Sequence, residues 1–456
     1  MENGRRVVIV GGGIAGLSAA LAAREQGASA VVLERASTEE RGGNTRFSNA
    51  AIRAVGEEGD PRGLTREQFL ADFEKVTEHR ADPALVELVV DHSADTRRWL
   101  MAHGVVPYDP KLSRWNMGAD LSDALYRAAE TAEVEVRYAT RAVSLLETES
   151  SVAGVRVESS RRRSDLFGDA VILAAGGFEA NPEWRARYLG PGWDLVKVRG
   201  SRFNTGDGLR MALEAGAMPF GHWSGCHTTN WDVNAPDQNT LAFATVFKRD
   251  TFNHGIMVNR RGERFQDEGE DASGLIYAKL GRIILSQPAG VAWQVYDSKS
   301  IPLLPPEYHA AASTRFKADS LENLAALMEG IDVERFLATV REFNAAVRED
   351  IPFDAGRKDG RCTIGLSTPK SNWARKVDEP PFEAYPVTTG ITFTFGGVRI
   401  DLAGHVLDCD GEVIPGLYAA GEMVGGLFYF NYPGGVGLTS SAVIGRIAGR
   451  TAALGD

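Results

Sequence analysis

The chain has little cysteine, no excess of positive charge and no long apolar run. Its three cysteines, Cys226, Cys362 and Cys409, stand far apart in 456 residues and form no CxxC pair. This arrangement excludes a zinc site built on paired cysteines and a disulfide framework. We therefore expect a reducing, cytoplasmic compartment.

The charge balance and the apolar patterning exclude two kinds of partner. Lys and Arg total 50 against 61 Asp and Glu, so the formal net charge is −11. A nucleic-acid partner would require a basic face, and no apolar run approaches the ~20 residues that span a bilayer. Arg5 and Arg6 precede an apolar stretch, as in a secretory signal, but the glycines at 11–13 interrupt it, so we assign it to the mature fold.

The most informative segment lies at residues 5–35. An apolar run at 7–10 meets Gly11-x-Gly13-x-x-Gly16, an Ala-rich helical stretch follows, and a second apolar run stops at Glu34, 21 residues after Gly13. Gly11 permits the tight strand-to-helix turn, Gly13 lets backbone amides approach a pyrophosphate, and Gly16 lets the helix pack on the sheet. The carboxylate of Glu34 suits ribose hydroxyls and repels a 2′-phosphate. The segment predicts an adenine dinucleotide without that phosphate.

The length favours two domains, and the composition changes twice along the chain. We expect strands at 134–138, 143–146, 152–157 and 169–175, and helices over 64–103 and 320–348. Tryptophans and prolines gather from about 226 to 384, and the final segment returns to apolar strands followed by glycines, with a helix ending near Gly449. We therefore predict a cofactor-binding domain at 1–225 and 385–456, interrupted by a second domain at 226–384.

Several glycine-rich and polar motifs span nearly the whole chain. In their sequence and order the chain resembles the fumarate reductase and succinate dehydrogenase flavoprotein superfamily. The stretches at 225–227, 264–271, 391–397 and 430–435 are most similar to the tricarballylate dehydrogenase branch. The resemblance implies an α/β fold, with a Rossmann-type, glutathione-reductase-like FAD-binding domain and an inserted α+β capping domain. The motifs that carry it are Gly11–Gly16 with Glu34, Gly43–Thr45, Ala174–Phe178, Asn204–Gly208, Asn259–Phe265, Phe395–Val398 and Ala420–Glu422.

The chain departs from the superfamily at four positions. Asn44 stands where succinate dehydrogenases attach FAD through a histidine, so the resemblance implies non-covalent FAD. Ala272 stands where relatives place a proton-donating arginine or a tyrosine. Tyr432 replaces a substrate-binding arginine, and Phe393 replaces a histidine. These departures argue against efficient fumarate reduction.

The remaining candidates must handle a proton and hold a substrate. His227 matches a substrate-contacting histidine of the superfamily, the alternative being a surface or capping histidine. Tyr432 lies in a Gly- and Pro-rich turn, where its hydroxyl can donate to a carboxylate or carbonyl; the alternative is that its ring packs on the flavin. Tyr277 is a further candidate for proton transfer, the alternative being a packing residue. Arg249, with Lys248, can anchor a carboxylate.

Other positions complete the predicted site. The acidic run at 267–271 reads as a solvated loop in which one carboxylate orients the proton donor, metal binding being the less favoured interpretation. Phe393 and Gly434 are added as substrate-binding residues. The predicted cofactor-binding residues are Gly11, Gly13, Ala15, Gly16, Glu34, Arg35, Gly43, Asn44, Thr45, Val143, Ala175, Gly176, Asn204, Asp207, Gly421, Glu422, Gly437, Leu438 and Thr439.

The sequence thus predicts an FAD-dependent dehydrogenase or reductase of CH–CH groups, similar to tricarballylate dehydrogenase. Hydride moves between flavin N5 and a carbon next to a carboxylate or carbonyl. The expected partners are a small-molecule substrate and an electron donor or acceptor, without nucleic acid or a membrane span. Ketosteroid-dehydrogenase-like and fumarate-reductase-like enzymes, an FAD oxidase or monooxygenase, and a non-enzymatic flavin protein remain the alternatives.

Overall fold

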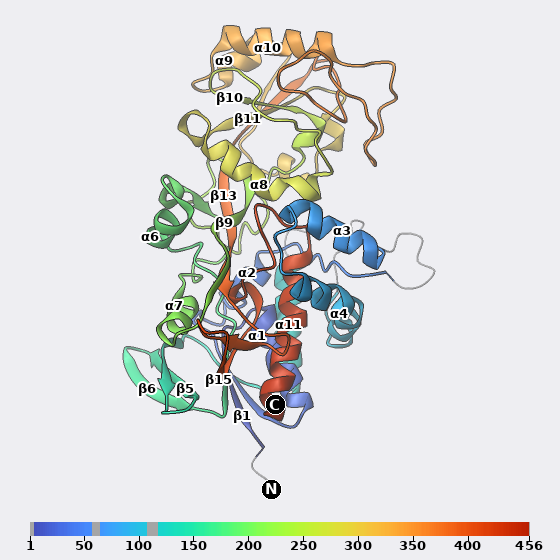
Figure 1. Cartoon of the computed structure of the whole chain (residues 1–456). Helices are drawn as coiled ribbons and strands as arrows, with labels where there is room; N and C mark the ends of the chain where they lie inside the picture. The colour runs from blue at the N-terminus through green and yellow to red at the C-terminus, as the bar shows by residue number, and fades with distance from the viewer. Residues whose placement is uncertain (1–3, 57–63, 107–116, 456) are drawn as a thin grey trace. The chain divides into compact units, whose positions relative to one another are not determined.

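The computed structural model describes residues 4–56, 64–106 and 117–455, which fold into two compact units (Figure 1). Unit 1 comprises Met1–His227, Gln238–Ala244 and Thr392–Asp456. Unit 2 comprises Thr228–Asp237 and Thr245–Ile391.

Unit 1 is built on a six-stranded sheet with the order β14-β15-β7-β1-β2-β3. Neighbours from β15 to β3 run parallel, and β14 is antiparallel to β15. The central strands are apolar throughout because helices cover a parallel sheet, and Val7, Val8 and Ile9 are completely buried. The strands are β1 (Arg6–Val10), β2 (Ser29–Leu33), β3 (Glu135–Arg137), β7 (Ala170–Leu173), β14 (His405–Leu407) and β15 (Val413–Ala419).

The first and last helices of unit 1, α1 (Ile14–Glu25) and α11 (Val436–Leu454), lie side by side (Figure 1). Glycines allow the close approach. A Cβ on Gly445 would lie 2.4 Å from the carbonyl oxygen of Ala15, and one on Gly449 would lie 2.1 Å from that of Ala19. The predicted end of α11 near Gly449 is wrong, because the helix continues to Leu454 and its C-cap is Gly455 in the left-handed region.

The other helices and strands of unit 1 lie outside this sheet. Asp82 caps α4, its Oδ1 accepting from the amides of Ala84 (3.0 Å) and Leu85 (3.3 Å). A second, antiparallel sheet has the order β4-β5-β6. The elements are α2 (Gly43–Arg46), α3 (Arg66–Thr77), α4 (Pro83–Ala102), α5 (Met117–Thr131), β4 (Arg141–Glu147), β5 (Val152–Ser159), β6 (Arg162–Phe167), α6 (Pro182–Trp184), β8 (Lys197–Val198) and α7 (Asp207–Glu214).

Unit 2 is built on an antiparallel sheet with the order β10-β11-β13-β12. One of its cores joins Trp293 and Val295 of the sheet to Phe336 and Phe343 of a helix. Two long strands, β9 (Pro219–Asp232) and β13 (Phe382–Val398), contribute residues to both units. The remaining elements are β10 (Ile256–Asn259), α8 (Ser273–Leu285), β11 (Ala292–Tyr296), β12 (Phe316–Ala318), α9 (Leu321–Leu327) and α10 (Val333–Ala346).

Candidate cofactor and substrate site

The glycine motif between β1 and α1 has the stereochemistry that its spacing predicts. Gly11 has φ +113°, and a Cβ there would lie 2.2 Å from the carbonyl oxygen of Ala174. A Cβ on Gly16 would lie 1.9 Å from the carbonyl oxygen of Gly11. Gly13 is different: it caps α1, and its Cβ would approach the protein no closer than 3.5 Å, at Thr45 Oγ1. The bare Cα of Gly13 therefore leaves space in front of the amides of α1, as a bound pyrophosphate needs.

Glu34 follows β2 and is 6% exposed. Its Oε1 accepts from the amide of Ala36 (2.8 Å), and its Oε2 accepts from the amide of Gly42 (3.3 Å). The hydroxyl of Tyr126 lies 3.2 Å from Oε2 and 2.9 Å from the carbonyl oxygen of Gly12. Burial raises the pKa of Glu34. A carboxylate offers about four acceptor positions, and these contacts use one on Oε1 and two on Oε2, so Glu34 can still accept from one ribose hydroxyl at Oε1. Tyr126 was missed by the sequence analysis.

Arg35 and Asp207 bring two predicted cofactor segments together. Arg35 Nη1 donates to Asp207 Oδ2 (2.7 Å), to Thr205 Oγ1 (2.6 Å) and to the carbonyl oxygen of Phe203 (3.2 Å). Arg141 pairs with the other oxygen of Asp207 (2.5 Å). The end of β2 is thereby fixed to the start of α7.

A carboxyl pair of Glu179 and Glu422 lies within unit 1. Glu179 is fully buried, and its Oε1 accepts from Nδ2 of Asn44 and Nδ2 of Asn204, both at 2.7 Å. Oε1 of Glu422 accepts from the amide (2.7 Å) and the hydroxyl (3.1 Å) of Thr394. Burial and the neighbouring carboxyl raise the pKa of Glu179 well above its usual value, and burial raises the pKa of Glu422 to about 7. Both shifts favour the protonated form, so the pair resists becoming doubly ionised.

An aromatic triad, His227, Phe393 and Tyr432, lies at the first turn of α11. The rings of His227 and Phe393 stack at 4.9 Å and 10°, and Tyr432 stands nearly perpendicular to both, at 4.7 and 5.2 Å. A Cβ on Gly437 would lie 3.8 Å from the ring of Tyr432 and 3.9 Å from that of Phe393. The amide of Gly435 donates to the Tyr432 hydroxyl oxygen (3.4 Å). Two candidates for proton transfer and one for substrate contact are therefore adjacent.

His227 is not at the surface. It is 1% exposed, Tyr432 is 7% exposed, and Phe393 is half-buried. Gly434 lies in the turn between Tyr432 and α11. The alternative of a surface histidine is thus wrong.

The other predicted cofactor residues occupy the same unit. Thr45 Oγ1 accepts from the amide of Ile14 (2.9 Å), and the Asn204 side chain covers Gly176 so closely that a Cβ there would lie 2.6 Å from Nδ2. The hydroxyl of Thr439 donates to the carbonyl oxygen of Arg53 (2.6 Å). The rest follow β7 (Ala175), lie in α1 (Ala15), α2 (Gly43), β4 (Val143) and α11 (Leu438), or begin the short helix at 421–423 (Gly421).

Two predicted site residues belong to unit 2. Arg249 is fully buried and pairs with the buried Asp232 (2.9 Å), and its Nη2 also donates to Ser313 (2.7 Å). Tyr277, on α8, packs against an apolar cluster that includes Phe252. Neither residue lies in the unit that contains His227 and Tyr432.

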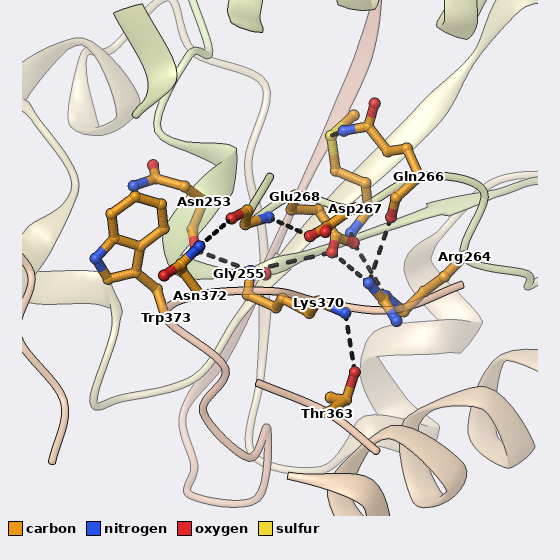
Figure 2. Close-up of polar contacts among 12 residues, drawn as sticks. Asn253, Gly255, Arg264, Gln266, Asp267, Glu268, Thr363, Lys370, Asn372 and Trp373 are labelled. Atoms are coloured by element: carbon orange, nitrogen blue, oxygen red, sulfur yellow. Dashed lines mark hydrogen bonds and ion pairs between the residues drawn. The ribbon is translucent and has the colours of Figure 1, made fainter. Parts of the chain in front are cut away.

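The acidic run at 267–271 is not a solvated loop throughout, and this expectation is wrong for two of its members. Glu268 is fully buried and receives Nε (3.1 Å) and Nη2 (2.5 Å) of Arg264, and Asp271 is 5% exposed. Asp267 Oδ1 accepts from the amide of Gly269 (2.8 Å). Figure 2 shows this network with Lys370, and the described residues contain no group of three side chains suited to a metal ion.

Known proteins with similar sequences support an FAD site at Gly13 and Glu34. The sequence pattern of the FAD binding domain family matches residues 6–112 and 106–438. A probable fumarate reductase of Shewanella frigidimarina (strain NCIMB 400) is 31% identical, the match covering 98% of this chain and 74% of that protein. Urocanate reductase of Eggerthella lenta is 27% identical, with 98% and 74% covered.

A solved structure, the open conformation of a flavocytochrome c3 fumarate reductase, aligns with a TM-score of 0.78. The aligned sequences are 27% identical, and the alignment covers 99% of this chain and 78% of the fumarate reductase chain. The fold and the glycine cradle define an FAD-binding oxidoreductase, which confirms the predicted fold class. The chain belongs to the fumarate reductase and succinate dehydrogenase flavoprotein superfamily. No helix within the described ranges is long and apolar enough to cross a membrane.

Proposed function

We propose that this protein is an FAD-dependent oxidoreductase that desaturates a C–C bond, or reduces a C=C bond, next to a carboxylate or carbonyl group. The observation that carries the proposal is the aromatic triad at the first turn of α11, in a unit whose Gly13 and Glu34 suit FAD. Bound FAD supplies hydride transfer at N5. The finer assignment, a tricarballylate dehydrogenase-like enzyme of the cytoplasm, is part of this proposal.

The residues divide the work between binding and proton transfer. Gly13 and the N-terminus of α1 would hold the pyrophosphate of FAD, and Glu34 would accept from a ribose hydroxyl. Tyr432 holds or delivers the proton at its hydroxyl oxygen, whose position is fixed by the amide of Gly435 at 3.4 Å. His227 stacks on Phe393 and borders Tyr432, so it orients the phenol or relays the proton. The buried rings of His227 and Tyr432 limit the access of water to the phenol.

Anaerobic mixing tests the reaction. The FAD-loaded protein is reduced with dithionite and mixed with fumarate, acrylate or urocanate, and the return of the oxidised flavin band is followed. We expect at least one unsaturated acid to reoxidise the flavin much faster than buffer does. Rapid reoxidation by O₂ alone, or direct reduction by NAD(P)H, would instead favour an oxidase or monooxygenase.

The cofactor should be bound without a covalent link. Asn44 offers no nucleophilic imidazole, and its Nδ2 is engaged by Glu179 (2.7 Å) and by the carbonyl oxygen of Thr392 (2.9 Å). Acid precipitation of the holoprotein should release all flavin absorbance into the supernatant. Flavin that stays with peptides after precipitation and proteolysis contradicts this prediction.

A further inference from the structure

The buried Lys and Arg residues of the described ranges differ in the ion pairs and hydrogen bonds that they make. Four Lys or Arg residues are buried there: Arg185, Arg199, Arg249 and Lys370. Arg249 has Asp232 at 2.9 Å, Lys370 donates to two carbonyl oxygens at 2.7 and 2.8 Å, and Arg185 donates to two at 2.6 and 2.7 Å. Arg199 donates only to the hydroxyl of Thr392, from Nη1 at 3.1 Å. Its guanidinium is therefore the least satisfied of the four.

Arg199 is 8% exposed and makes no ion pair with any residue in the described part of the chain. Its Nε is buried there without a hydrogen-bond partner. A guanidinium has five N–H donors, and a buried charge without compensation is costly. The fold thus keeps an unneutralised cation inside unit 1.

The backbone around Arg199 is held firmly, so the side chain is not placed there by a loose loop. Nδ2 of the buried Asn239 donates to the carbonyl oxygen of Arg199 (2.9 Å). The next residue, Gly200, packs on Asn44 so tightly that a Cβ would lie 2.2 Å from Asn44 Oδ1. Arg199 therefore adjoins a predicted FAD-binding residue, and its partner Thr392 directly precedes Phe393 of the aromatic triad.

We infer that Arg199 is the anchor for a carboxylate of the substrate, a role that the sequence analysis gave to Arg249. Guanidinium and carboxylate form two parallel hydrogen bonds, and Thr392 fixes one edge of the guanidinium. A phosphate of FAD has similar chemistry, but the predicted phosphate contacts are on the loop between β1 and α1. Arg199 instead donates to Thr392 of β13 and precedes Gly200, which packs on Asn44. The inference rests on the proposed function only in assigning the anion to the substrate.

Thermal unfolding of the holoprotein tests the site without knowledge of the natural substrate. Acetate, fumarate and urocanate are compared with chloride at equal ionic strength, for wild type, Arg199→Gln and the control Arg185→Gln. We expect at least one carboxylate, but not chloride, to raise the wild-type Tm, and Arg199→Gln to lose this rise. Without carboxylate, Arg199→Gln should melt about 2 °C above wild type because a buried charge is removed. Arg185→Gln, which loses two hydrogen bonds, should melt lower and keep the rise.

Titrations then separate the possible sources of the anion. The Kd of the stabilising carboxylate should increase about 10- to 100-fold in Arg199→Gln, with the Kd of FAD unchanged. A weakened FAD complex with an unchanged carboxylate response would assign Arg199 to the cofactor and overturn the inference. So would a wild-type Tm that no carboxylate raises. If carboxylates bind through Arg199 but none exchanges electrons with the flavin, the anchor stands and the proposed function fails.

Discussion

Tyr432→Phe should slow the substrate-dependent redox reaction of the flavin by ~10²- to 10⁴-fold, the usual contribution of general acid–base catalysis. The change removes one hydroxyl and keeps the ring that packs on His227 and Phe393, so FAD content and Tm should remain near wild type. The amide of Gly435 donates to the phenol oxygen and so fixes the position of the hydroxyl group. Single-turnover stopped-flow measurements with the fastest acid found for wild type give the rate.

Tyr429→Phe is the matched control, since it also removes only a hydroxyl, from a ring that stacks on His222 at 5.7 Å. We expect that variant to react at the wild-type rate. If Tyr432→Phe reacts equally fast, the proton passes elsewhere, and His227 and Tyr277 become the residues to replace. A loss of FAD from Tyr432→Phe would instead indicate a role in binding.

Glu179→Gln should stabilise the FAD-free protein at pH 8 by about 1 to 3 kcal/mol and change little at pH 5. In wild type the pKa of Glu179 lies well above its usual value, and that of Glu422 rises to about 7 from 4.5 in the unfolded chain. Between the unfolded pKa of 4.5 and the folded pKa of about 7, the carboxyl groups of the unfolded chain lose protons that the folded pair retains. The free energy of unfolding therefore falls as pH rises through this window.

Glu179→Gln removes one ionisable group of the carboxyl pair and can keep the surrounding hydrogen bonds. Its Oε1 can accept from Asn44 and Asn204 as Glu179 does, and its amide can donate to Glu422. Thermal melts of the apoprotein from pH 5 to 8 measure the effect. Glu183→Gln, at an exposed carboxylate paired with Arg187, should show the wild-type pH profile. An equal loss of stability at both pH values would mean that Glu179 acts only through packing.

Site residues could be predicted from the sequence where their roles depend only on neighbouring parts of the chain. Gly11, Gly13, Gly16 and Glu34 follow from the geometry of one strand–helix–strand unit, so their positions were predicted from spacing alone. Tyr126 shares the carboxylate of Glu34 across 92 residues, and no local pattern distinguishes it from a packing tyrosine.

The substrate side was harder to predict because it depends on which charges neutralise each other. Arg249 looked like a free cation beside Lys248, but Asp232, 17 residues earlier, pairs with it. Arg199 carried no motif, and its lack of a carboxylate partner among the described residues becomes visible only in three dimensions. The acidic run similarly looked solvated, because a series of carboxylates in the sequence does not reveal that Arg264 pairs with the buried Glu268.

The contact between α1 and α11 also determines when the cofactor site can be completed during synthesis. Helix α1, which follows Gly13, packs through Ala15 and Ala19 on Gly445 and Gly449, and β15 pairs with β7. The strand and turn predicted to face the pyrophosphate are synthesised before their packing partners, which follow more than 400 residues later. At about 5 to 20 residues per second that interval lasts tens of seconds. The glycine turn therefore lacks these packing partners for that interval, so we expect tight FAD binding only after α11 has been synthesised.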